Sequence, residues 1–181
     1  MASRAFTSWG MRRQPAWLTS PQALSVWALA DELGLHVDIE APVVGGAALA
    51  PTVEAMADRF PDLSIVLDHL FMPVLTDPDH GIDGGFVGLA ARPNVFLKFT
   101  SINLDFAREM GVDPALLLRR AVDVFSAGRV MWGSDIGTSS GTYAEMIDRA
   151  VAATGLLTDA KRTAVLHDTG QRVFAHEGKV G

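Results

Sequence analysis

Short apolar segments alternate with segments of helical periodicity along this chain. Five stretches have the nearly continuous apolar character of strands that are covered on both faces. They are residues 6–12, 35–40, 63–69, 94–100 and 129–135. Strands that alternate with helices in this way predict parallel βαβ units in an α/β fold.

The helices between these strands carry recognisable start signals. Ser20-Pro21 and Asp113-Pro114 each combine an N-cap residue with a proline in the first turn, and Thr158-Asp159 is a third cap. We expect helices at about 20–33, 52–60, 86–91, 113–125, 143–154 and 158–174. Residues 73–85 are rich in Pro, Asp and Gly and predict a long loop.

The strand count limits the architecture. A closed (β/α)8 barrel has eight strands and typically about 250 residues, whereas this chain has 181 residues and five predicted strands. We therefore interpret residues 1–181 as a single domain that is either an open five-stranded sheet or part of a barrel.

Composition excludes several classes of function. The chain is 49% hydrophobic and 20% charged, as in globular proteins, and its net charge is −6 with no Lys/Arg cluster. These values argue against nucleic acid or an anionic membrane surface as a partner. There are no cysteines, no apolar run of about 20 residues and no secretory signal, so we expect a cytoplasmic location.

Polar residues stand at the ends of two predicted strands. His69 ends the apolar run that begins at Ser64, and Asp135 ends the run that begins at Arg129. An imidazole there can polarise a carbonyl or bind a metal, and a carboxylate can accept a proton from water. The alternative roles are a hydrogen-bonded buried histidine and a turn-capping aspartate. Strand alternation predicts that Asp68 faces the helix layer, opposite to His69, and is structural.

Three further strand-end residues are candidates for substrate contacts. Glu40 could act as an acid, a base or a ligand, although His36 and Asp38 share its face and would need partners there. Arg12 could hold a substrate carboxylate bidentately, and Lys98 could supply a point charge. The alternative for each cation is an ordinary ion pair with a neighbouring carboxylate.

Two motifs resemble a known family. Val66-Leu67-Asp68-His69 followed by Pro73, and Val130-Met131-Trp132-Gly133-Ser134-Asp135, resemble the amidohydrolase-related (amidohydrolase 2) TIM-barrel family. That family includes enzymes similar to pyrone-dicarboxylate lactonase and to aminocarboxymuconate-semialdehyde decarboxylase. The resemblance implies a partial (β/α)8 barrel in which the five predicted strands correspond to barrel strands 4 to 8.

The chain also departs from the family pattern. Members begin with a His-x-His strand that supplies metal ligands or catalytic histidines, and this sequence contains no His-x-His. We therefore expect an N-terminally truncated barrel that lacks the first three strands. With His69 and Asp135 as its main ligands, such a chain should bind a divalent metal such as zinc weakly or not at all.

The resemblance implies hydrolysis of an ester, lactone or amide bond in a small carboxylate-bearing molecule by activated water. Asp135 would be the general base and His69 would stabilise the oxyanion, with or without a metal. The alternatives are a decarboxylase on the same scaffold, or a catalytically impaired fragment that self-associates. A homo-oligomer through exposed sheet edges is expected in the last case.

Overall fold

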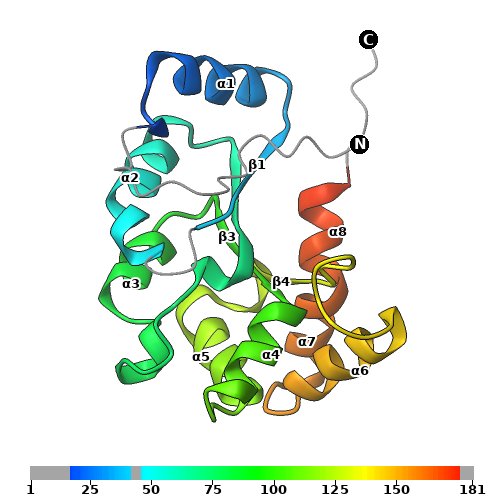
Figure 1. Cartoon of the computed structure of the whole chain (residues 1–181). Helices are drawn as coiled ribbons and strands as arrows, with labels where there is room; N and C mark the ends of the chain where they lie inside the picture. The colour runs from blue at the N-terminus through cyan, green and yellow to red at the C-terminus, as the bar shows by residue number, and fades with distance from the viewer. Residues whose placement is uncertain (1–16, 42–45, 176–181) are drawn as a thin grey trace.

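A computed structural model describes residues 17–41 and 46–175. Four parallel strands form one sheet in the order β1-β2-β3-β4, with each strand next to its successor (Figure 1). Their bounds are β1 His36–Ile39, β2 Ser64–Leu67, β3 Val95–Thr100 and β4 Val130–Gly133. The predictions of these four strands are confirmed. The strand predicted at 6–12 lies outside the described residues.

Helices connect and flank the strands. Their bounds are α1 Pro21–Glu32, α2 Gly46–Arg59, α3 Gly84–Ala90, α4 Ser101–Glu109, α5 Pro114–Phe125, α6 Tyr143–Ala153, α7 Asp159–Thr163 and α8 Thr169–Phe174. Short helical turns add η2 Asp68–Phe71, η3 Pro78–Gly81, η4 Ala127–Arg129 and the π-helical segment η5 Ala164–Asp168. In Figure 1, α2 and α3 lie to one side of the sheet and α6 to α8 to the other.

The predicted capping residues begin their helices. The side chains of Ser20, Asp113 and Thr158 each accept a hydrogen bond from a backbone N–H in the first turn. Two predictions need correction. Helix α2 begins at Gly46 rather than at 52, because Pro51 is accommodated inside the helix. Helix α4 was not expected, since residues 101–109 carry no proline or acidic cap signal; Thr100 caps it instead.

The two faces of the sheet differ. One face packs on the main hydrophobic core beneath the helices, to which alternate strand residues contribute: Val37, Ile39, Ile65, Leu67, Val95, Leu97, Phe99 and Val130. The other face, here called the second face, carries a small apolar cluster of Val66, Phe96 and Met131 against Val173 of α8. By strand alternation, the second face also presents the polar residues His36, Asp38 and Lys98.

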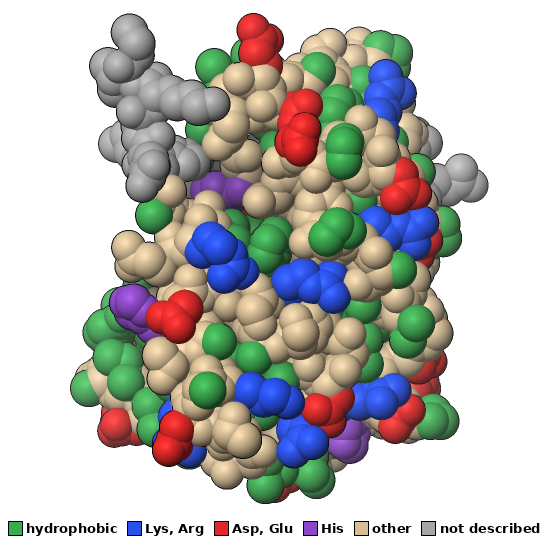
Figure 2. All heavy atoms as spheres, turned by 180° about the vertical axis from the view of Figure 1, so that it is seen from behind, with side chains coloured by type: hydrophobic (Ala, Val, Ile, Leu, Met, Phe, Trp, Pro, Cys, Tyr) green, Lys and Arg blue, Asp and Glu red, His purple; other side chains and the backbone are tan. Residues whose placement is uncertain are grey.

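The architecture is α/β, and the parallel sheet with its helices corresponds to part of a barrel. Basic and acidic side chains are interspersed on the face of the molecule that Figure 2 shows. Within 17–41 and 46–175, no helix is long and apolar enough to cross a bilayer.

Candidate active site

The chain turns sharply after β2 in a left-handed conformation. Four consecutive residues have positive φ: His69 (53°), Leu70 (51°), Phe71 (59°) and Met72 (50°). This conformation costs about 1–2 kcal/mol per L-residue. Burial of Leu70 and Phe71 in the core and a 2.8 Å hydrogen bond from Met72 N to His69 O offset that cost. Such strain is characteristic of sites where a side chain must be held in a fixed direction.

The left-handed turn places His69 between the ends of the neighbouring strands. Its Nδ1 lies 2.8 Å from Thr100 Oγ1 at the end of β3, and its Nε2 lies 3.6 Å from Glu40 Oε1, just beyond β1. The carboxyl ends of parallel strands share one edge of the sheet, which is why residues so far apart in sequence meet there. The predicted site residues His69 and Glu40 are therefore brought together.

Thr100 and Asn103 complete the surroundings of His69. Asn103 Nδ2 donates to His69 O at 2.8 Å, and Asn103 Oδ1 accepts from Thr100 N at 3.0 Å and Thr100 Oγ1 at 3.3 Å. Neither residue was predicted from the sequence. Their signal was a threonine at a strand end with asparagine three residues on, which is a capping pattern. Glu40, His69, Thr100 and Asn103 are called the strand-tip site below.

A second polar group, the Lys98 cluster, consists of Asp38, Asp68 and Lys98 on the second face. Lys98 Nζ lies 3.3 Å from Asp38 Oδ2 and in direct contact with Asp68 Oδ1. The prediction that Asp68 faces the helix layer is wrong. Strand β2 ends at Leu67 and His69 has left-handed dihedral angles, so alternation continues to Asp68 but not beyond it.

Charges in the Lys98 cluster shift the ionisation of its members. Burial raises the pKa of Asp68, and repulsion from Asp38 adds to the rise, while attraction to Lys98 opposes it. Burial alone would lower the pKa of Lys98, but the two carboxylates outweigh it and raise that pKa. An ammonium shared by two carboxylates thus stays protonated. This arrangement matches the ion-pair alternative for Lys98.

His36 and Asp38 were expected to need partners because they share a strand face with Glu40. Asp38 pairs with Lys98, and Glu40 faces His69. The His36 ring packs edge-on against Phe174 with ring centroids 4.7 Å apart, and its Nε2 lies 4.0 Å from Asp38 Oδ1. Asp38 and Glu40 therefore have partners, which offsets the cost of placing two carboxylates there.

Asp135 lies at the same edge of the sheet, after β4. It has a left-handed φ of 54° and begins a turn, in which its carboxylate accepts from Ser139 Oγ at 3.3 Å. Strand β4 is two positions from β2, a separation of about 10 Å at normal strand spacing. Among the described residues, no hydrogen bond or ion pair joins Asp135 to His69. Arg12 lies outside the described residues.

The donor set does not form a metal centre within the described part of the chain. A catalytic zinc site needs three protein ligands. No group of three His, Cys, Asp or Glu side chains in residues 17–41 and 46–175 is arranged to hold a metal ion. His69 Nε2 and Glu40 Oε1 supply two neighbouring donors at most. We therefore derive no step through a metal.

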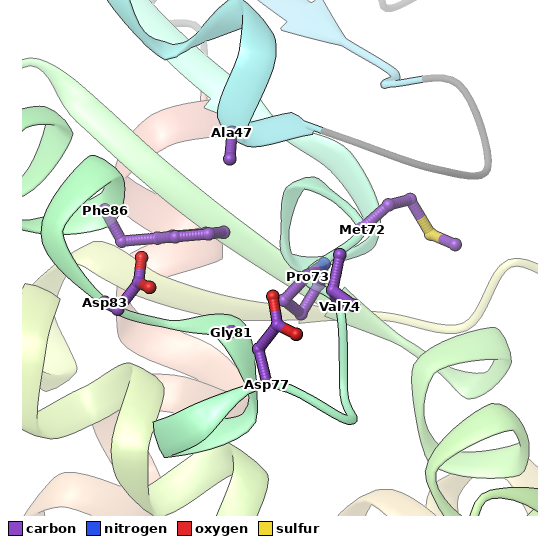
Figure 3. A pocket seen from close by; sticks show the side chains of 8 residues that line it. All are labelled: Ala47, Met72, Pro73, Val74, Asp77, Gly81, Asp83 and Phe86. Carbon is purple, nitrogen blue, oxygen red and sulfur yellow. The ribbon is translucent and has the colours of Figure 1, made fainter.

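A small cavity opens beside the left-handed turn (Figure 3). It has a volume of about 70 Å³ and is lined by Ala47, Met72, Pro73, Val74, Asp77, Gly81, Asp83 and Phe86. Sites for small-molecule ligands usually measure about 300–1,000 Å³. This cavity contains no atom of the strand-tip site and is much smaller than such ligand sites, so it is not the candidate active site.

The parallel sheet and the polar groups along its carboxyl edge define a protein of the α/β-barrel class. The chain belongs to the amidohydrolase family, whose model matches residues 9–175. It is 35% identical over 91 residues to L-fucono-1,5-lactonase from Burkholderia ambifaria, a match that covers 47% of this chain and 30% of the lactonase.

Solved structures share the fold. An amidohydrolase from Burkholderia multivorans with bound zinc is 21% identical with a TM-score of 0.68, over 88% of this chain and 59% of that one. A candidate 2-pyrone-4,6-dicarboxylic acid hydrolase from Pseudomonas putida is 24% identical with a TM-score of 0.66, over 90% and 59%. A manganese-bound dihydroxybenzoic acid decarboxylase from Polaromonas is 14% identical with a TM-score of 0.61, over 87% and 55%. The chain thus spans less than two thirds of these relatives.

Proposed function

We propose that this chain hydrolyses an ester or lactone bond in a small carboxylate-bearing molecule, with water as the nucleophile. The observation that carries the proposal is the imidazole–carboxylate pair of His69 and Glu40 at the carboxyl ends of adjacent parallel strands. Barrel enzymes carry their chemistry at that edge. The lactonase relative, at 35% identity, supports a lactone as the substrate.

The proposed reaction has two proton transfers, one from the attacking water and one to the leaving oxygen. Asp135 takes a proton from the attacking water as the new C–O bond forms. His69 donates a hydrogen bond from Nε2 to the oxygen on which negative charge develops. When the ring C–O bond breaks, the leaving oxygen takes the Nε2 proton. Arg12 remains our prediction for the contact to the substrate carboxylate.

The test is a pH-stat assay of the purified chain with L-fucono-1,5-lactone and with 2-pyrone-4,6-dicarboxylate, corrected for spontaneous hydrolysis. We expect acid release with at least one of them. His69→Gln and Asp135→Asn should each lower kcat/KM by about 10²- to 10³-fold. The matched controls are His167→Gln and Asp123→Asn. Both residues are exposed and pair with residues outside the strand-tip site, Asp168 and Arg119, so these variants should leave the rate unchanged.

Decarboxylation on the same scaffold is the alternative reaction. It releases CO₂ and consumes no water, so trapping of CO₂ from 2,6-dihydroxybenzoate separates it from hydrolysis. CO₂ release without acid release from either lactone would replace our proposal, and full lactone hydrolysis by His69→Gln would contradict the role of His69.

We also propose that the chain self-associates. In the described part of the structure, β1 and β4 each pair with a strand on one side only. Unpaired edges of parallel strands offer backbone groups to a second copy. Size-exclusion chromatography with light scattering should give a mass above 19.3 kDa, the mass of one chain. A stable monomer would contradict this.

A further inference from the structure

We propose that Thr100 and Asn103 are positioning residues that fix the proton of neutral His69 on Nδ1, so that His69 exchanges protons with the substrate through Nε2 alone. The catalytic consequence rests on the proposed function. The tautomer itself is a property of the folded chain and can be measured without any substrate.

The orientation of the Asn103 amide is fixed by two partners that have only one hydrogen-bonding role each. The carbonyl of His69 can only accept, so the group 2.8 Å from it must be the Asn103 NH₂. The backbone N–H of Thr100 can only donate, so the group 3.0 Å from it must be the Asn103 oxygen. Both conditions select the same rotamer of the amide. Asn103 and Thr100 are buried, so water does not replace either partner.

The position of the Thr100 hydroxyl proton follows from this orientation. Asn103 Oδ1 has no proton to give, and it lies 3.3 Å from Thr100 Oγ1. We infer that the single proton of the hydroxyl points to Asn103, because two oxygen atoms 3.3 Å apart with no proton between them would repel each other. Thr100 Oγ1 is left as an acceptor toward His69 Nδ1, 2.8 Å away, and that nitrogen must carry a proton to make the bond.

The Nε2 atom is then the only position of the ring that gains or loses a proton. In the neutral ring Nε2 carries a lone pair on the side of Glu40, whose Oε1 lies 3.6 Å away and so beyond hydrogen-bond length. A proton taken up at Nε2 creates an imidazolium that both neighbours stabilise, Thr100 Oγ1 at one nitrogen and the Glu40 carboxylate at the other. The arrangement keeps the reactive nitrogen directed to the open edge of the sheet, because Glu40 is the most exposed member of the site, with its side chain 36% exposed.

The tautomer is read from long-range ¹⁵N–¹H spectra of the ¹⁵N-labelled chain at about pH 9, where an ordinary imidazole is neutral. The His69 signals are those that disappear in His69→Gln. We expect a protonated Nδ1 and an unprotonated Nε2 in the wild type. Thr100→Val, which removes the hydroxyl at equal size, should move the proton to Nε2. Thr100→Ser should restore the wild-type pattern.

The matched control is Thr169→Val. Thr169 is as deeply buried as Thr100 and also uses its hydroxyl in one hydrogen bond, to Ala127 O at 3.0 Å, but it does not contact the strand-tip site. This variant should leave the His69 tautomer unchanged. With a lactone that the wild type hydrolyses, Thr100→Val should lower kcat by about 10- to 100-fold with little change in KM, and Thr169→Val should not.

Several outcomes would overturn the inference. A wild-type His69 with its neutral proton on Nε2 does so directly, even if Thr100→Val fails to fold. An unchanged tautomer in a folded Thr100→Val also does so. If the tautomer behaves as expected but no lactone is hydrolysed, the positioning role stands and the proposed function fails, so the two failures are distinguishable.

Discussion

The strand-tip site and the Lys98 cluster are built from neighbouring positions on the same three strands, yet they are opposites in chemistry. Each strand end contributes one residue to each group, and the two residues lie one or two positions apart in the sequence. The pairs, with the member of the Lys98 cluster first, are Asp38 and Glu40, Asp68 and His69, and Lys98 and Thr100. The Lys98 cluster consists of full charges that neutralise one another in a buried setting. The strand-tip site is held by hydrogen bonds, and within the described part of the chain Nε2 of His69 faces only the Glu40 carboxylate, which is 36% exposed.

This difference indicates which polar residues at the edge of a sheet stabilise the fold and which can react with a substrate. A charge that is already shared by two partners contributes to the fold but has little left to offer a substrate. A ring whose one nitrogen is anchored and whose other nitrogen is open can still transfer a proton. Both groups lie equally close to the strand ends. The number of partners that a side chain already binds is therefore a better guide to a catalytic role than its position at a strand end.

The largest effect should come from breaking the Lys98 cluster. Lys98→Met leaves the buried Asp68 and the half-buried Asp38 without a cation, and the loss of a buried pair's cation typically costs about 3–5 kcal/mol in the free energy of unfolding. His69→Gln should cost only about 1 kcal/mol, the value of one hydrogen bond. Urea unfolding of both variants measures the contrast. Equal losses in the two variants would remove the distinction between the groups.

An exposed ion pair provides the control for that experiment. Arg119 contacts Asp123 at 2.8 Å on the surface of α5. Arg119→Met removes a cation with the same substitution, but it should cost no more than about 1 kcal/mol because water screens the remaining carboxylate. A loss as large as that of Lys98→Met would show that the burial of the cluster does not matter.

A smaller effect is expected from displacing the left-handed turn. A Cβ on Gly46, the first residue of α2, would clash with the backbone carbonyl and the ring of Phe71. Gly46→Ala should therefore cost about 1–3 kcal/mol and shift the turn that carries His69. Gly84, the first residue of α3, has open space around it, and Gly84→Ala should be neutral or stabilising by up to about 1 kcal/mol.

The Gly46→Ala variant should disturb the strand-tip site but not the Lys98 cluster. We expect its His69 ring signals to move in the NMR spectrum while the pH dependence of stability that Asp68 contributes is retained. A thermal unfolding curve identical to that of the wild type would mean that the turn is not held as tightly as its packing indicates.

The pH dependence of the free energy of unfolding tests the Lys98 cluster without removing Lys98. The pKa of Asp68 is raised above its ordinary value of 3.8. A carboxyl that binds protons more tightly when folded contributes stability that is complete below 3.8 and is lost as the pH rises through its folded pKa. The free energy of unfolding of the wild type, minus that of Asp68→Asn, should therefore fall as the pH rises from about 3 to about 7.

Lys98 shows the same linkage at the alkaline end. Its pKa is raised above 10.5, so the stability that it contributes is complete below 10.5 and is lost only above it. The acidic experiment thus reports on Asp68 while Lys98 stays charged. A difference between wild type and Asp68→Asn that rises with pH in that range would contradict the direction of the Asp68 shift.

Much of the fold could be predicted from local signals. Asp113 and Pro114 define the start of α5 by capping chemistry alone, and the apolar run from Ser64 to Leu67 defines β2. Helix α4 was missed because its cap, Thr100, is also the last residue of a strand and was assigned to it. Thr100 both ends β3 and caps α4. A prediction that assigns each residue to a single element cannot give it both roles.

The site was predictable in its residues but not in its contacts. Strand ends identified His69 and Glu40, which the structure brings together. The left-handed turn could not be foreseen, since His69 and Leu70 have no glycine-like freedom. This turn removes His69 from the strand alternation on which the expected direction of Asp68 was based. Thr100 and Asn103 were missed because their bonds depend on the three-dimensional neighbourhood of β2 and β3.

The smallest effect should come from added zinc. Two adjacent donors, His69 Nε2 and Glu40 Oε1, are one short of a catalytic zinc site, so binding should be weak. We expect excess zinc to raise the free energy of unfolding by less than about 1 kcal/mol. We also expect dialysed protein to retain far less than one zinc per chain by mass spectrometry. His69→Gln should abolish the small shift, whereas Lys98→Met should leave it intact, because an ammonium that binds two carboxylates is no zinc ligand. Tight zinc in the dialysed wild type would mean that the strand-tip site is more complete than its described residues indicate.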